Sequence, residues 1–182
     1  VVNLGAGSDN DFISTCRLYT DIEVHHTNGE AFSAASLAKM NACDAIIAAV
    51  YNDKQATRNN LAQLAKAADK PVIGVFMVNP YRMAKFSASL PSLSAIVLAY
   101  EDIAAERVSA AEAIFGGISV SGRLPVILNG IAKAGEGISY EKSALGFSSP
   151  TAEGMAAWLT DSLDAVVRKA LAADAFPGCQ LL

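Results

Sequence analysis

Charged residues are scarce in this sequence. They make up 18% of its 182 residues, against about 25% in an average soluble protein. Basic residues are not in excess, because 14 lysines and arginines stand against 18 aspartates and glutamates, for a formal net charge of −4. This balance argues against nucleic acid or an anionic membrane as the main partner. The sequence also lacks any apolar run of the roughly 20 residues that a membrane-spanning helix needs.

Cysteine and histidine are nearly absent as well. The three cysteines, Cys16, Cys43 and Cys179, lack CxxC spacing and are too few for a disulfide scaffold. We expect Cys16 and Cys43 to be ordinary buried thiols. The only histidines, His25 and His26, are adjacent and would point to opposite faces of a strand. This disfavours a metal site, and the sequence predicts no cofactor.

Apolar residues are abundant, at 52%, and they fall into short segments that alternate with helix-like ones. Five segments have the apolar or alternating pattern of strands: residues 1–4, 22–26, 45–50, 72–78 and 95–99. Helices are expected after Ser8, over 32–40 and 57–68, from Asn79 to before Pro91, and from Asp102 to Phe115. This alternation implies a parallel sheet with right-handed crossovers and helices on both faces.

Capping residues set the expected ends of two of these helices. Ser8 has Asp11 three residues later, the spacing of a capping box, and is the expected N-cap of the first helix. Asp102 is the expected N-cap of the helix that runs to Phe115. The pair Gly116-Gly117 then supplies a left-handed C-terminal cap.

The predicted fold is a three-layer α/β/α sandwich with a mostly parallel, flavodoxin- or Rossmann-like sheet over residues 1–128. Residues 129–153 form a connector in this prediction, and 154–182 a tail with a helix over 156–172. The tail helix has an apolar stripe beside Trp158, formed by Leu159, Leu163, Val166, Val167 and Leu171. We expect the stripe to pack on the sandwich or on a second copy of the chain, which would make a homodimer.

Ligands of open parallel sheets bind at the carboxyl ends of the strands. The polar residues that follow the third and fourth predicted strands, Asn52, Asp53 and Asn79, are therefore the candidate substrate-binding residues. An aspartate in a loop can also be merely solvated, and the two asparagines can be helix caps. No catalytic constellation is evident among the residues of this chain.

A glycine-rich turn follows the first predicted strand, at Gly5-Ala6-Gly7. A dinucleotide fingerprint would have a third glycine where Asn10 stands, and an acidic residue after the second strand, where His25-His26-Thr27 is found. A Rossmann-like nucleotide-binding or redox domain is therefore the alternative function, and nucleotide affinity in a thermal-shift assay is its discriminator. A purely structural interaction module is the third option.

Residues 114–126 read Ile-Phe-Gly-Gly-Ile-Ser-Val-Ser-Gly-Arg-Leu-Pro-Val. This segment resembles the signature that closes the C-terminal α/β/α domain of glycoside hydrolase family 3, with Val120 in place of the usual proline. Segments 70–73, 79–81 and 95–100 also resemble that family's strands and turns, so that the resemblance covers residues 1–128.

The resemblance implies that the catalytic groups lie elsewhere. The family's retaining enzymes have an aspartate nucleophile on a preceding TIM barrel, which this chain lacks. In its β-glucosidase branch, the loop after the third strand supplies a glutamate as acid/base, whereas residues 51–54 here are Tyr-Asn-Asp-Lys. The resemblance therefore favours the β-N-acetylglucosaminidase branch, where the proton donor is a histidine on a barrel loop. It implies a missing barrel domain and a carbohydrate substrate as partners, and favours an extracytoplasmic location.

A second resemblance concerns the tail. Segments 148–150 (Ser-Ser-Pro), 153–155 (Glu-Gly-Met) and 176–180 (Phe-Pro-Gly-Cys-Gln) are similar to the start of a β-lactamase-type serine hydrolase domain. Some bacterial family 3 N-acetylglucosaminidases are followed directly by such a domain. The SxxK nucleophile motif, which this resemblance places further on, does not occur in residues 148–182. We therefore expect the chain to be an inactive piece of a longer polypeptide.

Overall fold

A computed structural model describes residues 1–27 and 29–179 of the chain. The pair Asn28-Gly29 predicts a turn, and Asn28 lies outside the described residues. So does Gln180, the end of the Phe-Pro-Gly-Cys-Gln segment. Residues 1–146 form one compact unit, and a second unit begins at Phe147. The two units are described separately.

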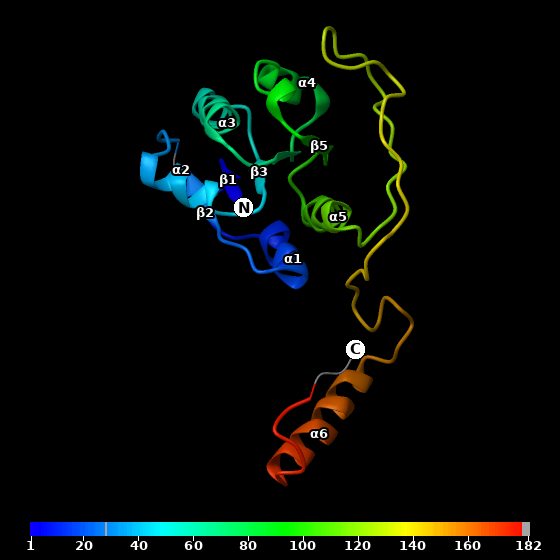
Figure 1. Cartoon of the computed structure of the whole chain (residues 1–182). Helices are drawn as coiled ribbons and strands as arrows, with labels where there is room; N and C mark the ends of the chain where they lie inside the picture. The colour runs from blue at the N-terminus through cyan, green and yellow to red at the C-terminus, as the bar shows by residue number, and fades with distance from the viewer. Residues whose placement is uncertain (28, 180–182) are drawn as a thin grey trace. The chain divides into compact units, whose positions relative to one another are not determined.

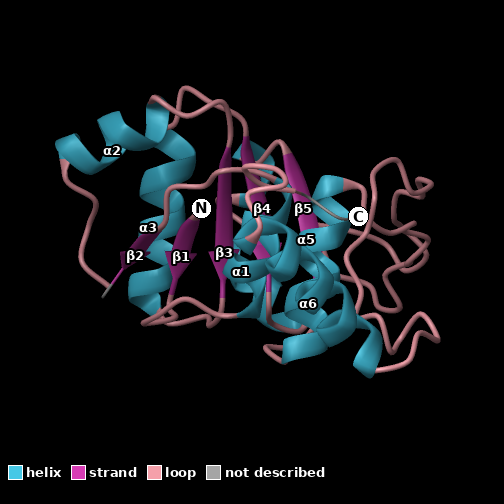
Figure 2. Cartoon of the chain, turned by 90° about the horizontal axis from the view of Figure 1, so that it is seen from below, coloured by secondary structure: helices cyan, strands magenta, loops and turns pink. Residues whose placement is uncertain are grey.

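The first unit is built on a sheet of five parallel strands. They are β1 (Val2–Leu4), β2 (His25–Thr27), β3 (Ile46–Val50), β4 (Val72–Phe76) and β5 (Ala95–Leu98). Their order in the sheet is β2-β1-β3-β4-β5, which is the flavodoxin-like order (Figure 2). On the central strand β3, Val50 pairs with Leu4 of β1 on one side and with Phe76 of β4 on the other.

Helices cover both faces of this sheet (Figure 1). One layer holds α1 (Asp11–Tyr19) and α5 (Ala104–Phe115), and the other holds α2 (Ala34–Asn41), α3 (Gln55–Ala67) and α4 (Pro80–Met83). The predicted three-layer α/β/α sandwich is confirmed. The parallel sheet explains the apolar composition, because strands covered on both faces have no polar side.

Each face of the sheet has its own hydrophobic core. Successive residues of β4 alternate between the two, with Val75 facing α1 and α5 and Phe76 facing the opposite layer. Phe12, Ile13 and Cys16 of α1 are fully buried in the first core. Burial raises the pKa of the Cys16 thiol to about 12, so that its predicted character as a buried thiol is confirmed. Cys43 is only half-buried, contrary to the prediction.

Two predicted helix starts are wrong. The N-cap of α1 is Asn10 rather than Ser8, because the Asn10 side chain accepts hydrogen bonds from Phe12 N at 3.1 Å and Ile13 N at 3.4 Å. The residue that precedes α5 is Ile103 rather than Asp102, whose carboxylate binds Arg107 instead. The predicted left-handed cap of α5 is confirmed, because Gly116 has φ of 75°.

Other predicted elements are longer than the observed ones. The second strand begins at His25 instead of residue 22, and α2 begins at Ala34 instead of residue 32. The predicted fourth helix is only the four residues of α4, followed by short 3-10 turns at Ala84–Phe86 and Leu90–Ser92. Pro91 cannot donate a helical hydrogen bond, and it disfavours helical backbone in the residue before it.

Residues 117–146 continue the first unit beyond α5. Two isolated antiparallel bridges, Val120 with Tyr140 and Leu128 with Ala132, make this segment an irregular hairpin. Leu128 is buried in the core beside α3 and α4, which attaches the hairpin to the sandwich.

The second unit has one helix, α6 (Trp158–Ala172). It confirms the helix predicted over 156–172, but it buries none of its residues, and Trp158 is 66% exposed. The predicted docking of its apolar stripe stays a prediction. None of the described helices combines the length and the apolar character needed to cross a bilayer.

Candidate functional site

The three candidate residues lie in two neighbouring loops at the carboxyl edge of the sheet. Asn52 and Asp53 follow β3, and Asn79 follows β4. The parallel pairing of β3 with β4 brings the two loops to the same edge. Each of the three side chains has partners within the protein, and these partners decide what the site can do.

Asn52 joins the loop after β3 to the end of β1. Its Nδ2 donates to Gly5 O at 3.2 Å, while its Oδ1 accepts from Thr57 Oγ1 at 2.7 Å and from Lys54 N at 3.1 Å. Gly5 has φ of +95°, and a Cβ there would lie 2.1 Å from Asn52 Nδ2. Gly5 is therefore required by the close approach of Asn52.

Gly5→Ala is expected to lower the free energy of unfolding by about 1–3 kcal/mol, the usual cost of a strained backbone conformation. The added methyl group would also displace the Asn52 amide. The matched control is Gly7→Ala, because a Cβ on Gly7 meets nothing within 4 Å. Urea unfolding followed by circular dichroism measures both variants. Equal stability of the two would contradict the role given to Gly5.

Asp53 is held by two cations from the segment after β4. Its Oδ1 accepts from Arg82 Nε at 2.9 Å and also from Arg82 Nη2, and its Oδ2 accepts from Lys85 Nζ. The Asp53 side chain is 15% exposed, whereas those of Arg82 and Lys85 are 44% and 55% exposed. The hydrogen bonds from Arg82 and then from Lys85 hold the pKa of Asp53 well below its usual value.

The lowered pKa of Asp53 predicts a pH-dependent contribution to stability. A carboxylate with a lowered folded-state pKa stabilises the protein above its unfolded pKa of about 4, and the contribution is lost as the pH falls below it. We expect Asp53→Asn to cost about 1 kcal/mol at pH 7, because its partners are half-exposed, and less at pH 3. Urea unfolding at both pH values measures this, with Asp44→Asn, at the opposite edge of the sheet, as control. An equal cost at both pH values would contradict the ion pairs.

Asn79 is the N-cap of α4. Its Oδ1 accepts from Arg82 N at 3.0 Å. Arg82 therefore contacts two of the candidate residues, Asn79 through its backbone and Asp53 through its guanidinium. The structure brings these two candidates together, while Asn52 is directed toward β1.

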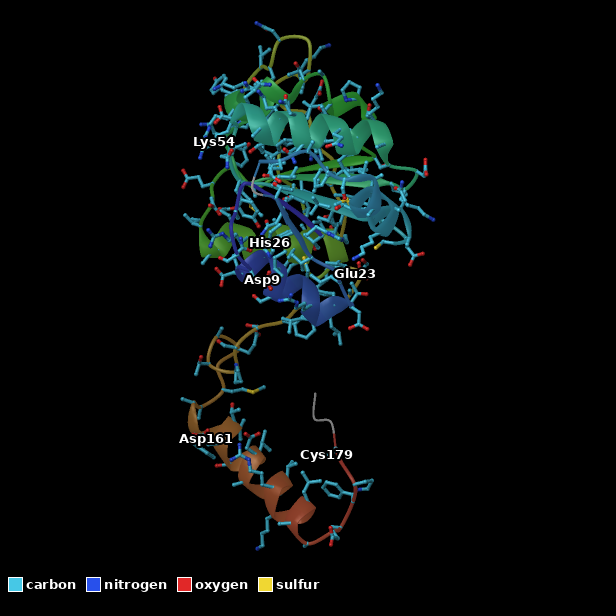
Figure 3. All side chains as sticks on the ribbon, turned by 90° about the vertical axis from the view of Figure 1, so that its left-hand side faces the viewer. Asp9, Glu23, His26, Lys54, Asp161 and Cys179 are labelled. Atoms are coloured by element: carbon cyan, nitrogen blue, oxygen red, sulfur yellow. The ribbon has the colours of Figure 1, made fainter. Side chains whose placement is uncertain are left out.

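A second polar group at this edge was not predicted from the sequence. His26 Nε2 lies 2.9 Å from Asp9 Oδ1 (Figure 3). His26 Nδ1 lies 3.2 Å from Asn3 Nδ2. Asp9 also forms an ion pair with Arg17. Both ring nitrogens of His26 are thus engaged within the protein. The signal that sequence reasoning missed is Asn3, a fully buried polar residue in an apolar strand, which needs hydrogen-bond partners.

The glycine-rich turn after β1 leads to a helix whose first N–H groups are already occupied. Asn10 stands where a dinucleotide fingerprint has its third glycine, and its side chain caps α1. Tyr51 Oη also donates to Asn10 Oδ1, at 3.3 Å. A pyrophosphate binds such a helix end through free backbone N–H groups, so the Asn10 cap counts against the nucleotide-binding alternative.

A hollow of about 290 Å³ lies elsewhere, along β2 and the start of α2. Its lining includes His25, His26, Glu30, Phe32 and Ser33. None of the three candidate residues lines it. In the described ranges 1–27 and 29–179, no three histidine, cysteine or acidic side chains gather in a way that suits a metal ion.

Comparison with known proteins yields no relative: no family model, no curated protein and no solved structure matches this chain.

Proposed function

We propose that this chain is the C-terminal domain of a family 3 glycoside hydrolase of the β-N-acetylglucosaminidase type. In this role residues 1–128 form one wall of the sugar site and supply no catalytic group. A preceding barrel domain of the same polypeptide supplies the nucleophile and the proton donor. The substrate is a glycan with terminal N-acetylglucosamine.

The observation that carries the proposal is the lowered pKa of the Asp53 carboxyl group, together with its two cationic partners. Asp53 is the only carboxylic acid in the loop after β3, where the β-glucosidase branch has its acid/base. A general acid at neutral pH needs a raised pKa, whereas Arg82 and Lys85 lower the pKa of Asp53. At neutral pH Asp53 is thus a carboxylate that accepts hydrogen bonds, which supports the branch whose catalytic groups all lie on the barrel.

The segment that resembles the family signature supports the same proposal. It begins at Ile114, in the last turn of α5, and continues into the hairpin. Leu124 N donates to Glu136 O at 2.8 Å, and Arg123 Nη2 donates to Ser139 Oγ at 2.7 Å. A Cβ on Gly137 would lie 2.4 Å from Gly122 O. A signature that ends a domain is expected to have this structural role.

For the tail, the proposal is that the segment from Phe147 onward leads from the sandwich into a serine hydrolase domain. The division into two compact units at residues 146 and 147 agrees with this arrangement.

The polypeptide that carries both the proposed barrel and this domain tests the role of Asp53. We expect Asp53→Ala to raise KM severalfold with little change in kcat, because a wall residue contributes mainly uniform binding. Asp44→Ala, located before β3 at the opposite edge, is the control and leaves both constants unchanged. Hydrolysis of p-nitrophenyl N-acetylglucosaminide measures them. A loss of kcat of about a thousandfold would place the acid/base at Asp53 and overturn the proposal.

A further inference from the structure

We propose that Arg58, Arg82 and Lys85 form a site for an oxyanion carried by the sugar ligand, such as a phosphate, sulfate or carboxylate substituent. We call these three residues the cationic triad. The inference deepens the proposed function, since it names the class of sugar that the wall of the site would favour, and its sugar-specific part rests on that function.

Asp53 holds the triad in one place. Arg82 and Lys85 donate to its carboxylate, and Arg58 Nη1 donates to its backbone oxygen at 2.8 Å. Arg58 Nη2 also donates to Gln55 Oε1. The three cations come from α3, α4 and the 3-10 turn after α4, so that no single helix accounts for their convergence.

The triad has more positive charge than its surroundings neutralise. Asp53 is the only described carboxylate that forms an ion pair with any of the three. The charges of the other arginines at this edge are neutralised by aspartates. Arg107 pairs with both Asp11 and Asp102, and Arg17 pairs with Asp9. The carboxyl edge is therefore basic over α3 and α4 and acidic over α1 and α5. Lys54, which follows Asp53 in the chain, adds to the basic side (Figure 3).

The triad also keeps donors for a ligand. Arg82 uses Nε and Nη2 on Asp53, and within the described residues its Nη1 makes no hydrogen bond. Lys85 has one described partner for its three N–H donors, and its side chain is 55% exposed. Guanidinium and ammonium groups in fixed positions bind oxyanions through charge-assisted hydrogen bonds. The triad lies at the edge where parallel sheets bind their ligands.

Calorimetric titration of the purified chain with inorganic phosphate, at constant ionic strength, tests the triad. We expect saturable millimolar binding, weakened at least fivefold in Lys85→Gln and in Arg58→Gln. Arg58→Gln leaves both ion pairs of Asp53 in place. A folding defect in one of the two variants therefore does not decide the result. The matched control is Lys66→Gln, an exposed lysine near the far end of α3, which should bind phosphate like the unaltered chain. No saturable binding, or equal weakening in the control, would overturn the site.

Two further titrations separate the sugar from the anion. N-acetylglucosamine 6-phosphate is expected to bind several times more tightly than inorganic phosphate, and N-acetylglucosamine without the phosphate more weakly than either. Equal affinity for the sugar phosphate and for phosphate would overturn the sugar-linked part of the inference. The glycosidase proposal is tested separately, because hydrolysis of the neutral p-nitrophenyl substrate does not depend on the triad binding an anion.

Discussion

Phe76→Ala is expected to lower the free energy of unfolding of the first unit by about 3–5 kcal/mol, the usual cost of removing a buried aromatic side chain. Phe76 is fully buried at the end of β4. Its ring packs edge-to-face on Phe86, with centroids 5.4 Å apart and an interplanar angle of 69°. The close-packed neighbours cannot fill the space of a lost ring, and the resulting cavity adds to the lost burial.

The control for Phe76→Ala is Tyr81→Ala in α4, whose ring is 63% exposed and should cost less than about 1 kcal/mol. Urea unfolding followed by far-ultraviolet circular dichroism compares the two. Because Phe76 precedes the loop that ends at Asn79, the variant also tests how strongly the core fixes the candidate site. A loss of less than about 1 kcal/mol in the free energy of unfolding for Phe76→Ala would mean that the core around Phe76 and Phe86 is not packed as described.

The second large effect is the absence of catalysis by the chain alone. Retaining hydrolysis in its usual form needs two carboxyl groups about 5–5.5 Å apart, one of them able to donate a proton. Asp53 is kept ionised by Arg82 and Lys85, and no SxxK motif occurs in residues 148–182, the tail that resembles the start of a serine hydrolase domain. We therefore expect residues 1–182 to leave p-nitrophenyl N-acetylglucosaminide and nitrocefin unhydrolysed, with rates equal to those of a buffer blank. Turnover of either substrate would contradict this prediction.

The fold could be predicted because its main signal is local. Apolar runs such as those that became β3 and β4 are typical of strands buried on both faces, and helical patterns between them fix the parallel topology. Helix boundaries were less predictable where two capping residues compete. Ser8 and Asn10 both precede α1, and the hydrogen bond from Tyr51, 41 residues further on, helps to hold Asn10 in the capping position.

The location of the candidate site could be predicted from the sequence, but the interaction partners of its residues could not. The rule that ligands bind at the carboxyl ends of parallel strands located Asn52, Asp53 and Asn79 at one edge. Their partners depend on contacts that no sequence pattern specifies. Arg82 is 29 residues from Asp53, and Lys85 is 32 residues away. The pairing of Asp9 with His26 likewise depends on the β1–β2 register.

We propose that this domain belongs to a glycosidase whose catalytic groups lie outside it. The most direct measurement compares hydrolysis of p-nitrophenyl N-acetylglucosaminide by two proteins under the same conditions: residues 1–182, and the polypeptide extended upstream to include the proposed barrel. We expect turnover by the extended polypeptide and none by residues 1–182. Turnover by residues 1–182 alone, or an extended polypeptide that leaves the substrate intact, would contradict the proposal.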